Sequence, residues 1–345
     1  MNPPSPTTAE SALAPTAAET LLPPFDPEDI ARHGANAHRV WRNASGHIEA
    51  RCSLWWDATP PVPGQRLGIL GHYAAATAAA GRGLLNEVCA ELAAHDCTQA
   101  VGPMDGNTWR RYRLVTERGD EPPFLLEPDT PHEWCEHFAS AGFTPLAHYR
   151  STVTDNLELE DPKARHAEQV LSVLGITLRP LDPRNLDQEL GEFHRITLAS
   201  FQRGFLYQPL PEEVFRREFS QLFPYLRPEL ILVAMHRGQA VGYVFNVPDL
   251  LAARRGQPVD TVILKTLAVI PDRTYAGLGR WLTQETHRAA RRLGYRRVIH
   301  ALMQDGNPST SLSARYARPF RRYALYHRAL GNRSDVTEIA APLAP

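Results

Sequence analysis

Two glycines, Gly277 and Gly279, follow Pro271 by six and eight residues and open a segment with helical periodicity. The first backbone N–H groups of a helix have no partner within the helix, and they lie at the positive end of its dipole. Glycines leave those donors uncovered, which suits the binding of a diphosphate. Glycines also occur as packing residues at helix starts. The pair therefore indicates a binding site only if its neighbouring elements fit.

The segments on both sides of the glycines have the patterns of a strand and a helix. Residues 261–270 are mostly apolar and end at Pro271, which cannot donate a hydrogen bond to a sheet. Apolar residues then recur at helical spacing, namely Leu278, Trp281, Leu282, Ala289 and Leu293. The order strand, turn and helix predicts that the donors of the turn lie beside the end of a strand.

Length and composition are those of a globular chain of about two domains. Of the 345 residues 43% are hydrophobic and 22% charged, and no apolar run is long enough for a membrane span. Residues 1–24 hold six of the 30 prolines and little charge, so we expect a disordered tail rather than a signal peptide. The four cysteines form no CxxC pair, which predicts no metal site and a reduced, cytoplasmic setting.

Charge is distributed unevenly along the chain. Residues 1–172 carry 13 Lys+Arg against 23 Asp+Glu, whereas residues 173–345 carry 24 against 15. A basic C-terminal half fits an anionic ligand there. The alternative is that the two halves attract each other across an interface. The same two readings apply to a run of arginines near the C-terminus: Arg315, Arg318, Arg321 and Arg322.

The pattern of strands and helices predicts an α/β fold (α+β by some schemes) with two similar domains. The C-terminal half has the order β-α-α-β-β-β-α-β-α-β, which implies a mixed, mostly antiparallel sheet flanked by helices. Strand, helix, strand, helix and strand recur about 190 residues earlier. We expect domains at 25–156 and 175–335, a linker at 157–174 that is a weak helix at best, and a tail at 336–345.

The C-terminal half resembles the GNAT acyltransferase superfamily, and the whole chain is similar to its tandem-domain members. The resemblance rests on Leu-Ala-Val-Ile-Pro at 267–271, on Gly277 and Gly279, on Asn307, and on the aromatic ending at 320–326. It implies that a bulged strand pairs with the pantetheine arm of acetyl-CoA or another acyl-CoA, and that the turn holds the pyrophosphate. It also implies that two central strands splay apart, so that thioester and acceptor amine meet in the gap.

The resemblance implies a set of cofactor contacts. Pantetheine would lie against Leu267, Ala268 and Val269. The pyrophosphate would lie against Arg273, Ala276, Gly277, Leu278, Gly279 and Arg280. Asn307 would touch the arm near the thioester. The N-terminal half, in which only Gly81 and Gly83 stand near a helix start, would be degenerate and would shape the acceptor cleft.

The chain departs from the superfamily pattern at two positions. Thr274 stands where Gln or Arg is usual, with Arg273 one residue earlier. Ala314 stands where a tyrosine commonly protonates the departing thiolate. The general acid is therefore Tyr316 through a shifted helix, Ser313 with a water, or absent.

The general base cannot be assigned from spacing alone. His300, on the strand after the glycine helix, and Glu213 are the candidates, and a histidine in such a strand is more often part of the core. Phe201, Phe205 and Tyr207 would line an acceptor pocket or cap the core.

These features favour an N-acyltransferase that uses acetyl-CoA and acts on an amine of a small molecule or peptide by direct attack in a ternary complex. One alternative is an aminoacyl-tRNA-dependent transferase on a tandem GNAT scaffold, and another is a catalytically silent acyl-CoA-binding module. For the leading reading we expect no nucleic-acid partner, no membrane partner, and a monomer or homodimer.

Overall fold

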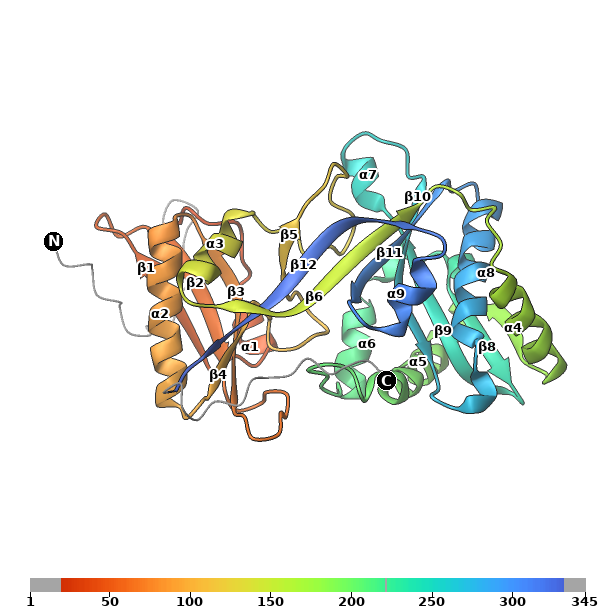
Figure 1. The fold of residues 1–345 in the computed structure, drawn as a ribbon, viewed down its shortest axis with the longest axis horizontal. Helices are drawn as coiled ribbons and strands as arrows, with labels where there is room; N and C mark the ends of the chain where they lie inside the picture. Colours follow the sequence, from red (N-terminus) through yellow and green to blue (C-terminus); the bar gives the residue numbers. More distant parts are fainter. Residues whose placement is uncertain (1–19, 221, 332–345) are drawn as a thin grey trace.

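The computed structural model describes residues 20–220 and 222–331, which form two lobes joined by one mixed sheet (Figure 1). The strand order is β1-β2-β3-β4-β12-β6-β11-β10-β9-β8-β7, and β5 pairs with β12. The predicted tails at 1–24 and 336–345 lie outside the described residues except for 20–24. In that short piece Thr20 bridges Ile48, and Leu22 is buried.

The N-terminal lobe confirms the predicted succession of strands and helices and adds two short elements. Its elements are α1 (Glu28–Arg32), β1 (Ala37–Arg42), β2 (Ile48–Trp55), β3 (Leu67–Ala75), α2 (Ala78–Ala94), β4 (Gln99–Gly102), β5 (Leu114–Glu117), α3 (Glu133–Ser140) and β6 (Thr144–Thr154). The elements α1 and β5 were not predicted, because each is too short to show a periodic pattern.

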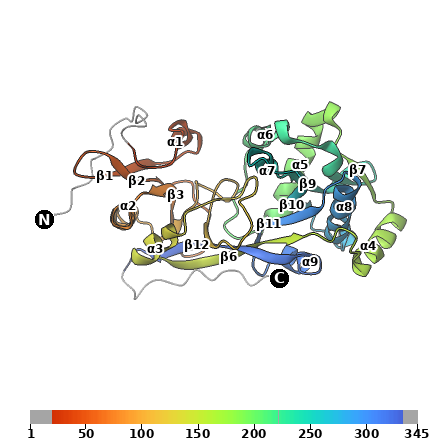
Figure 2. The same cartoon turned by 90° about the horizontal axis from the view of Figure 1, so that it is seen from above.

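The C-terminal lobe contains the predicted strand–turn–helix. Its elements are α4 (Pro162–Val173), β7 (Thr177–Pro180), α5 (Leu186–Phe201), α6 (Glu212–Ser220), β8 (Leu232–His236), β9 (Gln239–Pro248), α7 (Leu250–Arg254), β10 (Thr261–Val269), α8 (Leu278–Arg292), β11 (Arg297–Gln304), α9 (Pro308–Ser313) and β12 (Arg318–Ala329). Helices cover both faces of its sheet, with α5, α6 and α7 on one side and α4, α8 and α9 on the other (Figure 2).

Two long strands, β6 and β12, connect the lobes (Figure 1). They pair with each other antiparallel from Arg318↔Val153 to His327↔Thr144. At one end β6 also pairs with β11, and at the other β12 pairs with β4. The last strand of the chain therefore contributes to the sheet of the N-terminal lobe, and the sheet runs through both lobes without a break.

The expectation of a weak helix at best between the halves was wrong, because α4 is a helix of three turns. Asp161 caps it by accepting a hydrogen bond from the N–H of Lys163, and Pro162 follows in the first turn. Its buried face is formed by Ala164, Ala167 and Leu171, of which the last two belong to the same core cluster as Leu278 and Trp281 of α8. The buried contact with α8 stabilises a helix that looks weak by itself.

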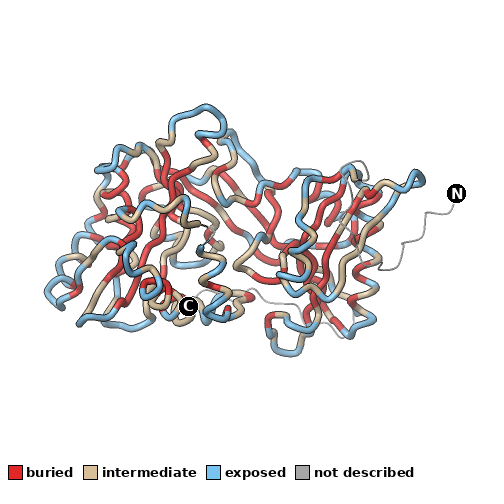
Figure 3. Tube along the Cα trace, turned by 180° about the vertical axis from the view of Figure 1, so that it is seen from behind, coloured by how far each residue is buried: buried red, intermediate tan, exposed pale blue. Residues whose placement is uncertain are grey.

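The buried residues follow the strands through the middle of both lobes (Figure 3). Ion pairs join the acidic first half to the basic second half, among them Arg288–Glu160 at 2.7 Å and Arg297–Glu121 at 2.6 Å. The run of arginines near the C-terminus makes such pairs with Asp161, Glu121, Glu127 and Glu117. The charge asymmetry therefore serves attraction between the halves, at least in part.

Among the described residues, none of the helices has the length and apolar character required to cross a membrane.

Candidate functional site

The two central strands of the C-terminal lobe separate, as expected. β10 pairs with β11 in parallel only from Thr261↔Arg297 to Leu264↔His300. Beyond that point β11 continues along β6, with a register shift after His300, and β10 continues along β9. Lys265 is the extra residue of a bulge in β10 at this position. The edge of β10 from Lys265 to Val269 therefore has no strand partner on the side of β11.

The glycine turn leaves its backbone donors open. Gly277 adopts a left-handed conformation (φ 90°) at the start of α8 and has no side-chain cap. The N–H groups of Gly277, Leu278 and Gly279 have no acceptor among the described residues, whereas that of Arg280 bonds to the carbonyl of Gly277 at 3.0 Å. Ala276 and Gly277 are exposed and Gly279 is half-buried, whereas Leu278 is fully buried. A Cβ on Gly279 would lie 3.6 Å from Leu267 of β10, so the turn adjoins the free edge of that strand.

A groove of about 440 Å³ borders this turn. One wall is α4, from which Lys163 and His166 line the groove, and the other contains Ala276, Gly277 and Arg280. A Cβ placed on Gly277 would lie 2.8 Å from the Cβ of Ala167, so the close approach of α4 also requires glycine here. The corner combines unpaired N–H groups with basic side chains, which is the chemistry of a phosphate site.

Asp161 connects the groove to the core between α8 and α9. Its side chain is fully buried and pairs with Arg280 at 3.0 Å and with Arg315 at 2.9 Å. Its own N–H donates to the side-chain oxygen of Gln284, which also accepts from the hydroxyl of Tyr316. Arg280 thus lines the groove while its guanidinium already forms an ion pair with the Asp161 carboxylate.

The other residues expected to contact a cofactor lie on β10, in the turn that follows it and at the start of α9. Leu267 and Val269 are half-buried on the free edge of β10, whereas Ala268 is fully buried. The N–H of Val269 lies 3.3 Å from the hydroxyl oxygen of Ser200 in α5. Arg273 is exposed in the turn, and the side chain of Asn307 caps α9 by accepting from the N–H of Ser309.

The structure brings the two predicted catalytic residues together, but in the core. His300 contacts His287 through Nε2 at 2.9 Å and Ser313 through Nδ1 at 2.8 Å, and burial lowers its pKa to about 4. The ring of Tyr316 packs edge-on against His287, and burial raises the pKa of its phenol. Both side chains are satisfied by protein partners, and their catalytic roles stay predictions. Glu213 lies exposed at the start of α6.

The equivalent corner of the N-terminal lobe is closed. The N-cap Thr77 of α2 accepts a hydrogen bond from the N–H of Ala80, so one donor of that helix start is already satisfied. A Cβ on Gly81 would lie 2.6 Å from both His137 and Tyr73. Between β3 and β4, a Cβ on Gly71 would lie 2.1 Å from a main-chain oxygen. These contacts leave little room for a ligand of the kind expected in the other lobe.

The N-terminal lobe holds a cluster of histidines instead. His72 contacts His33 and Ser53, each at 2.8 Å, and His38 contacts the same hydroxyl of Ser53 at 2.8 Å. Burial lowers the pKa of His33 and His38 to about 4 and that of His72 to about 3. Within residues 20–220 and 222–331, no group of His, Cys, Asp and Glu has an arrangement that could hold a metal.

The loop between α5 and α6 lies between the lobes. Trp109 of the N-terminal half donates to the carbonyl of Gln208 at 2.9 Å and stacks near Tyr207. Phe205 packs against the core cluster of the N-terminal lobe, whereas Phe201 packs within the C-terminal lobe. The buried hydroxyl of Tyr207 has no hydrogen-bond partner among the described residues. The loop therefore forms an aromatic wall against the cores of both halves, and its role in lining an acceptor pocket stays a prediction.

Sequence reasoning missed two cations at the gap between β10 and β11. Lys265 occupies the bulge, and Arg113 reaches it from the N-terminal half. A signal was present, because Lys265 is one of only two lysines in a chain rich in arginine. Arg113 has no comparable signal, because only the fold brings it to the gap.

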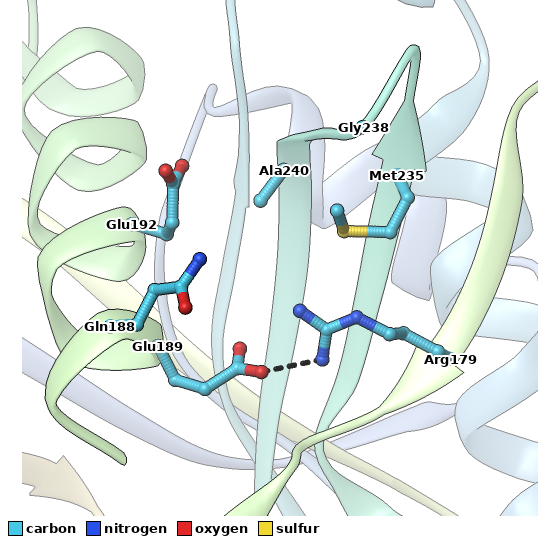
Figure 4. Close-up of a pocket in the computed structure, with 7 residues that line it drawn as sticks. All are labelled: Arg179, Gln188, Glu189, Glu192, Met235, Gly238 and Ala240. Atoms are coloured by element: carbon cyan, nitrogen blue, oxygen red, sulfur yellow. Dashed lines mark hydrogen bonds and ion pairs between the residues drawn. The ribbon is translucent and has the colours of Figure 1, made fainter. Parts of the chain in front are cut away.

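A second, smaller cavity of about 30 Å³ lies between α5 and the β8–β9 hairpin (Figure 4). Arg179 and Glu189 form an ion pair across it at 2.6 Å. The space suits one water. We assign it a structural role.

No protein-family model matches the sequence, and no curated protein matches it. Solved structures do resemble it. The glucosamine N-acetyltransferase region of a fungal multi-domain β-N-acetylglucosaminidase aligns with a TM-score of 0.52 at 13% identity, over 87% of this chain and 34% of that one. This chain thus spans about a third of that protein.

Two other structures align over most of both chains. A tandem GNAT protein from the clavulanic acid biosynthesis pathway has a TM-score of 0.49 at 15% identity, over 89% of this chain and 87% of that one. A GNAT-type N-acetyltransferase from Sphaerobacter thermophilus has a TM-score of 0.47 at 15% identity, over 90% and 88%. At such identities a likeness defines the fold and no more. The chain has the GNAT fold, as predicted.

Proposed function

We propose that this chain is an acyl-CoA-dependent N-acyltransferase that uses acetyl-CoA and acts on an amine of a small molecule or a peptide. The observation that supports this most strongly is the set of unpaired N–H groups on Gly277, Leu278 and Gly279, in a turn that borders a groove and adjoins a free strand edge. The N-terminal lobe, with its capped and filled helix start, lacks this combination.

The residues around the corner fit the parts of acyl-CoA. Gly277, Leu278 and Gly279 would hold the diphosphate, with Lys163 and Arg280 of the groove adding positive charge. The free edge of β10 would pair with the amide groups of pantetheine. When bound, acyl-CoA supplies an activated acyl group as a thioester.

The gap between the strands suits a direct transfer in a ternary complex. Under this proposal the aromatic wall formed by Trp109, Tyr207 and Phe205 would hold the acceptor. Holding two reactants in one geometry supplies a large part of the rate in such reactions. His300 and Tyr316 remain candidates for proton transfer, but neither has a free polar atom here.

Calorimetric titration with acetyl-CoA tests the cofactor, and Gly279 is the best position for a variant. A Cβ on Gly279 would have ordinary contacts of 3.6 Å and 3.8 Å, unlike one on Gly277. Gly279→Asp places a carboxylate beside the donors, and Gly279→Ala is the matched control. Loss of a charge-assisted hydrogen bond costs about 1.5–3 kcal/mol. We expect Gly279→Asp to bind roughly 10- to 100-fold more weakly, and Gly279→Ala to stay near the wild type.

The outcomes separate the alternatives. If the wild type does not bind acetyl-CoA, the proposal is contradicted. The aminoacyl-tRNA-dependent transferase is then the favoured alternative. Binding without release of free thiol, with any amine of a broad panel, supports the catalytically silent module instead. Equal affinity of the wild type and Gly279→Asp would place acetyl-CoA somewhere other than the glycine turn.

A further inference from the structure

Lys265 stands where β10 and β11 part. The parallel ladder ends at Leu264↔His300, and Lys265 is the next residue of β10, inserted as the extra residue of the bulge. Its side chain is half-buried. A bulge turns one side chain out of the regular alternation of a strand, and such bulges are frequent beside active sites. The position is thus the point at which the thioester and the acceptor would meet under the proposed function.

Among the described residues, the charged group that acts on Lys265 is a second cation, Arg113, and no carboxylate pairs with the lysine. Arg113 is almost fully buried, lies between the rings of Tyr112 and Tyr149 at 3.6 Å and 4.0 Å, and donates through Nη1 to the carbonyl of Leu302 at 3.0 Å. Leu302 belongs to β11 just beyond the gap, so the guanidinium reaches across to the separated strand.

No hydrogen bond or ion pair of the Lys265 ammonium is found within residues 20–220 and 222–331. Arg113 is the charged group that acts on it, and the phenols of Tyr112 and Tyr149 flank that arginine. Burial, with the charge of Arg113 as the smaller cause, lowers the pKa of Lys265 to about 8. A partly buried lysine with another cation nearby and no carboxylate partner holds its proton less tightly than a free lysine does.

We propose that Lys265 is a catalytic residue of this chain, the group that takes the proton from the acceptor amine during acyl transfer. The inference rests on the proposed function. The amine nitrogen forms the C–N bond with the thioester carbonyl carbon, the C–S bond breaks, and the electron pair leaves with sulfur. The proton that the amine loses passes to the neutral Nζ of Lys265, and the resulting ammonium returns a proton to the departing thiolate.

Lys265 is better placed for this task than the candidates from the sequence. Both ring nitrogens of His300 are engaged by His287 and Ser313, and Glu213 lies exposed on α6. A general base must reach the proton that it removes, and its pKa should lie near the working pH. Lys265 meets the second condition and lies at the gap where the first can be met.

A direct titration tests the residue without any assay of activity. The chain has only two lysines, so protein labelled with ¹³C-lysine gives two sets of side-chain signals, which a Lys163→Arg variant assigns. The Lys265 signal should titrate at least one pH unit below the ordinary value of about 10.4. It should also shift with acetyl-CoA and not with ADP, which lacks the arm. The inference is overturned if the pKa of Lys265 is at or above its ordinary value. It is also overturned if acetyl-CoA binds and the Lys265 signal does not shift.

Kinetics then distinguish a base from a fixed charge. Lys265→Arg keeps the positive charge but cannot accept a proton. Lys265→Met removes both the positive charge and the ability to accept a proton. Each should lower kcat about 10²- to 10⁴-fold and abolish the rise of rate with pH near 8, while the Kd for acetyl-CoA stays within about twofold. Arg254→Met, which removes an exposed cation of α7, is the control. Near-normal kcat in Lys265→Arg would overturn the inference and assign the side chain to binding an anion. Failure of the wild type to bind acetyl-CoA would instead refute the proposed function.

Discussion

Asp161→Asn should change stability and cofactor affinity in opposite directions. The Asp161 carboxylate is fully buried, while its partners Arg280 and Arg315 keep 25% and 49% of their side chains exposed. Breaking a fully buried pair costs about 3–5 kcal/mol. Because both arginines can turn to solvent, and because Asn caps a helix as well as Asp does, we expect a loss of about 1–3 kcal/mol.

The same substitution frees Arg280, which lines the groove at the glycine turn. Its guanidinium then becomes available to the diphosphate, and one partly solvated charge-assisted contact should tighten acetyl-CoA binding up to about tenfold. Scanning calorimetry should show Tm lower by about 2–8 °C, and isothermal titration at fixed ionic strength should show a lower Kd.

Glu160→Gln is the matched control, because it removes a neighbouring carboxylate that pairs with Arg288 away from the groove. It should cost less than about 1 kcal/mol and leave the affinity unchanged. A weaker Kd in Asp161→Asn would refute the reasoning and show that the pair holds the corner in its binding shape. An unchanged Tm in Asp161→Asn would contradict the stabilisation that we assign to the ion pairs of Asp161.

Two further predictions concern the N-terminal lobe. The pKa values of His33, His38 and His72 lie below the ordinary 6.5, so their contribution to stability is complete above pH 6.5 and is lost as pH falls toward 4. Urea midpoints should fall over this interval, and less steeply in His38→Gln; equal slopes would exclude His38 from the effect. Gly71→Ala should lower the free energy of unfolding by about 1–3 kcal/mol or more, because its Cβ would lie 2.1 Å from the Met104 oxygen. An unchanged urea midpoint in Gly71→Ala would mean that the main chain at Met104 does not fill the space beside Gly71.

The strand–turn–helix was predictable because its information is local. Pro271 ends a strand, Gly277 and Gly279 open a helix, and both patterns show within thirty residues. The helix α4 also had a local signal in Asp161-Pro162, but its many charged residues hid a narrow apolar face that is stable only against α8.

The exchange of β6 and β12 between the lobes could not be predicted in the same way. Pairing between residues as distant as 150 and 322 depends on the whole fold and leaves no local pattern. For the same reason the sequence did not bring Arg113 to Lys265, or Asp161 to Arg280. The residues expected from the resemblance all lie in the C-terminal half, whereas the partners that act on Lys265 and Arg280 come from the other half of the chain.

A crystal structure of the complex with CoA tests the central claim most directly. The account predicts the diphosphate within hydrogen-bond distance of the N–H groups of Gly277, Leu278 and Gly279, and the sulfur at the gap beside Lys265. A diphosphate bound elsewhere, for instance at the start of α2, or a sulfur remote from the gap, would contradict it.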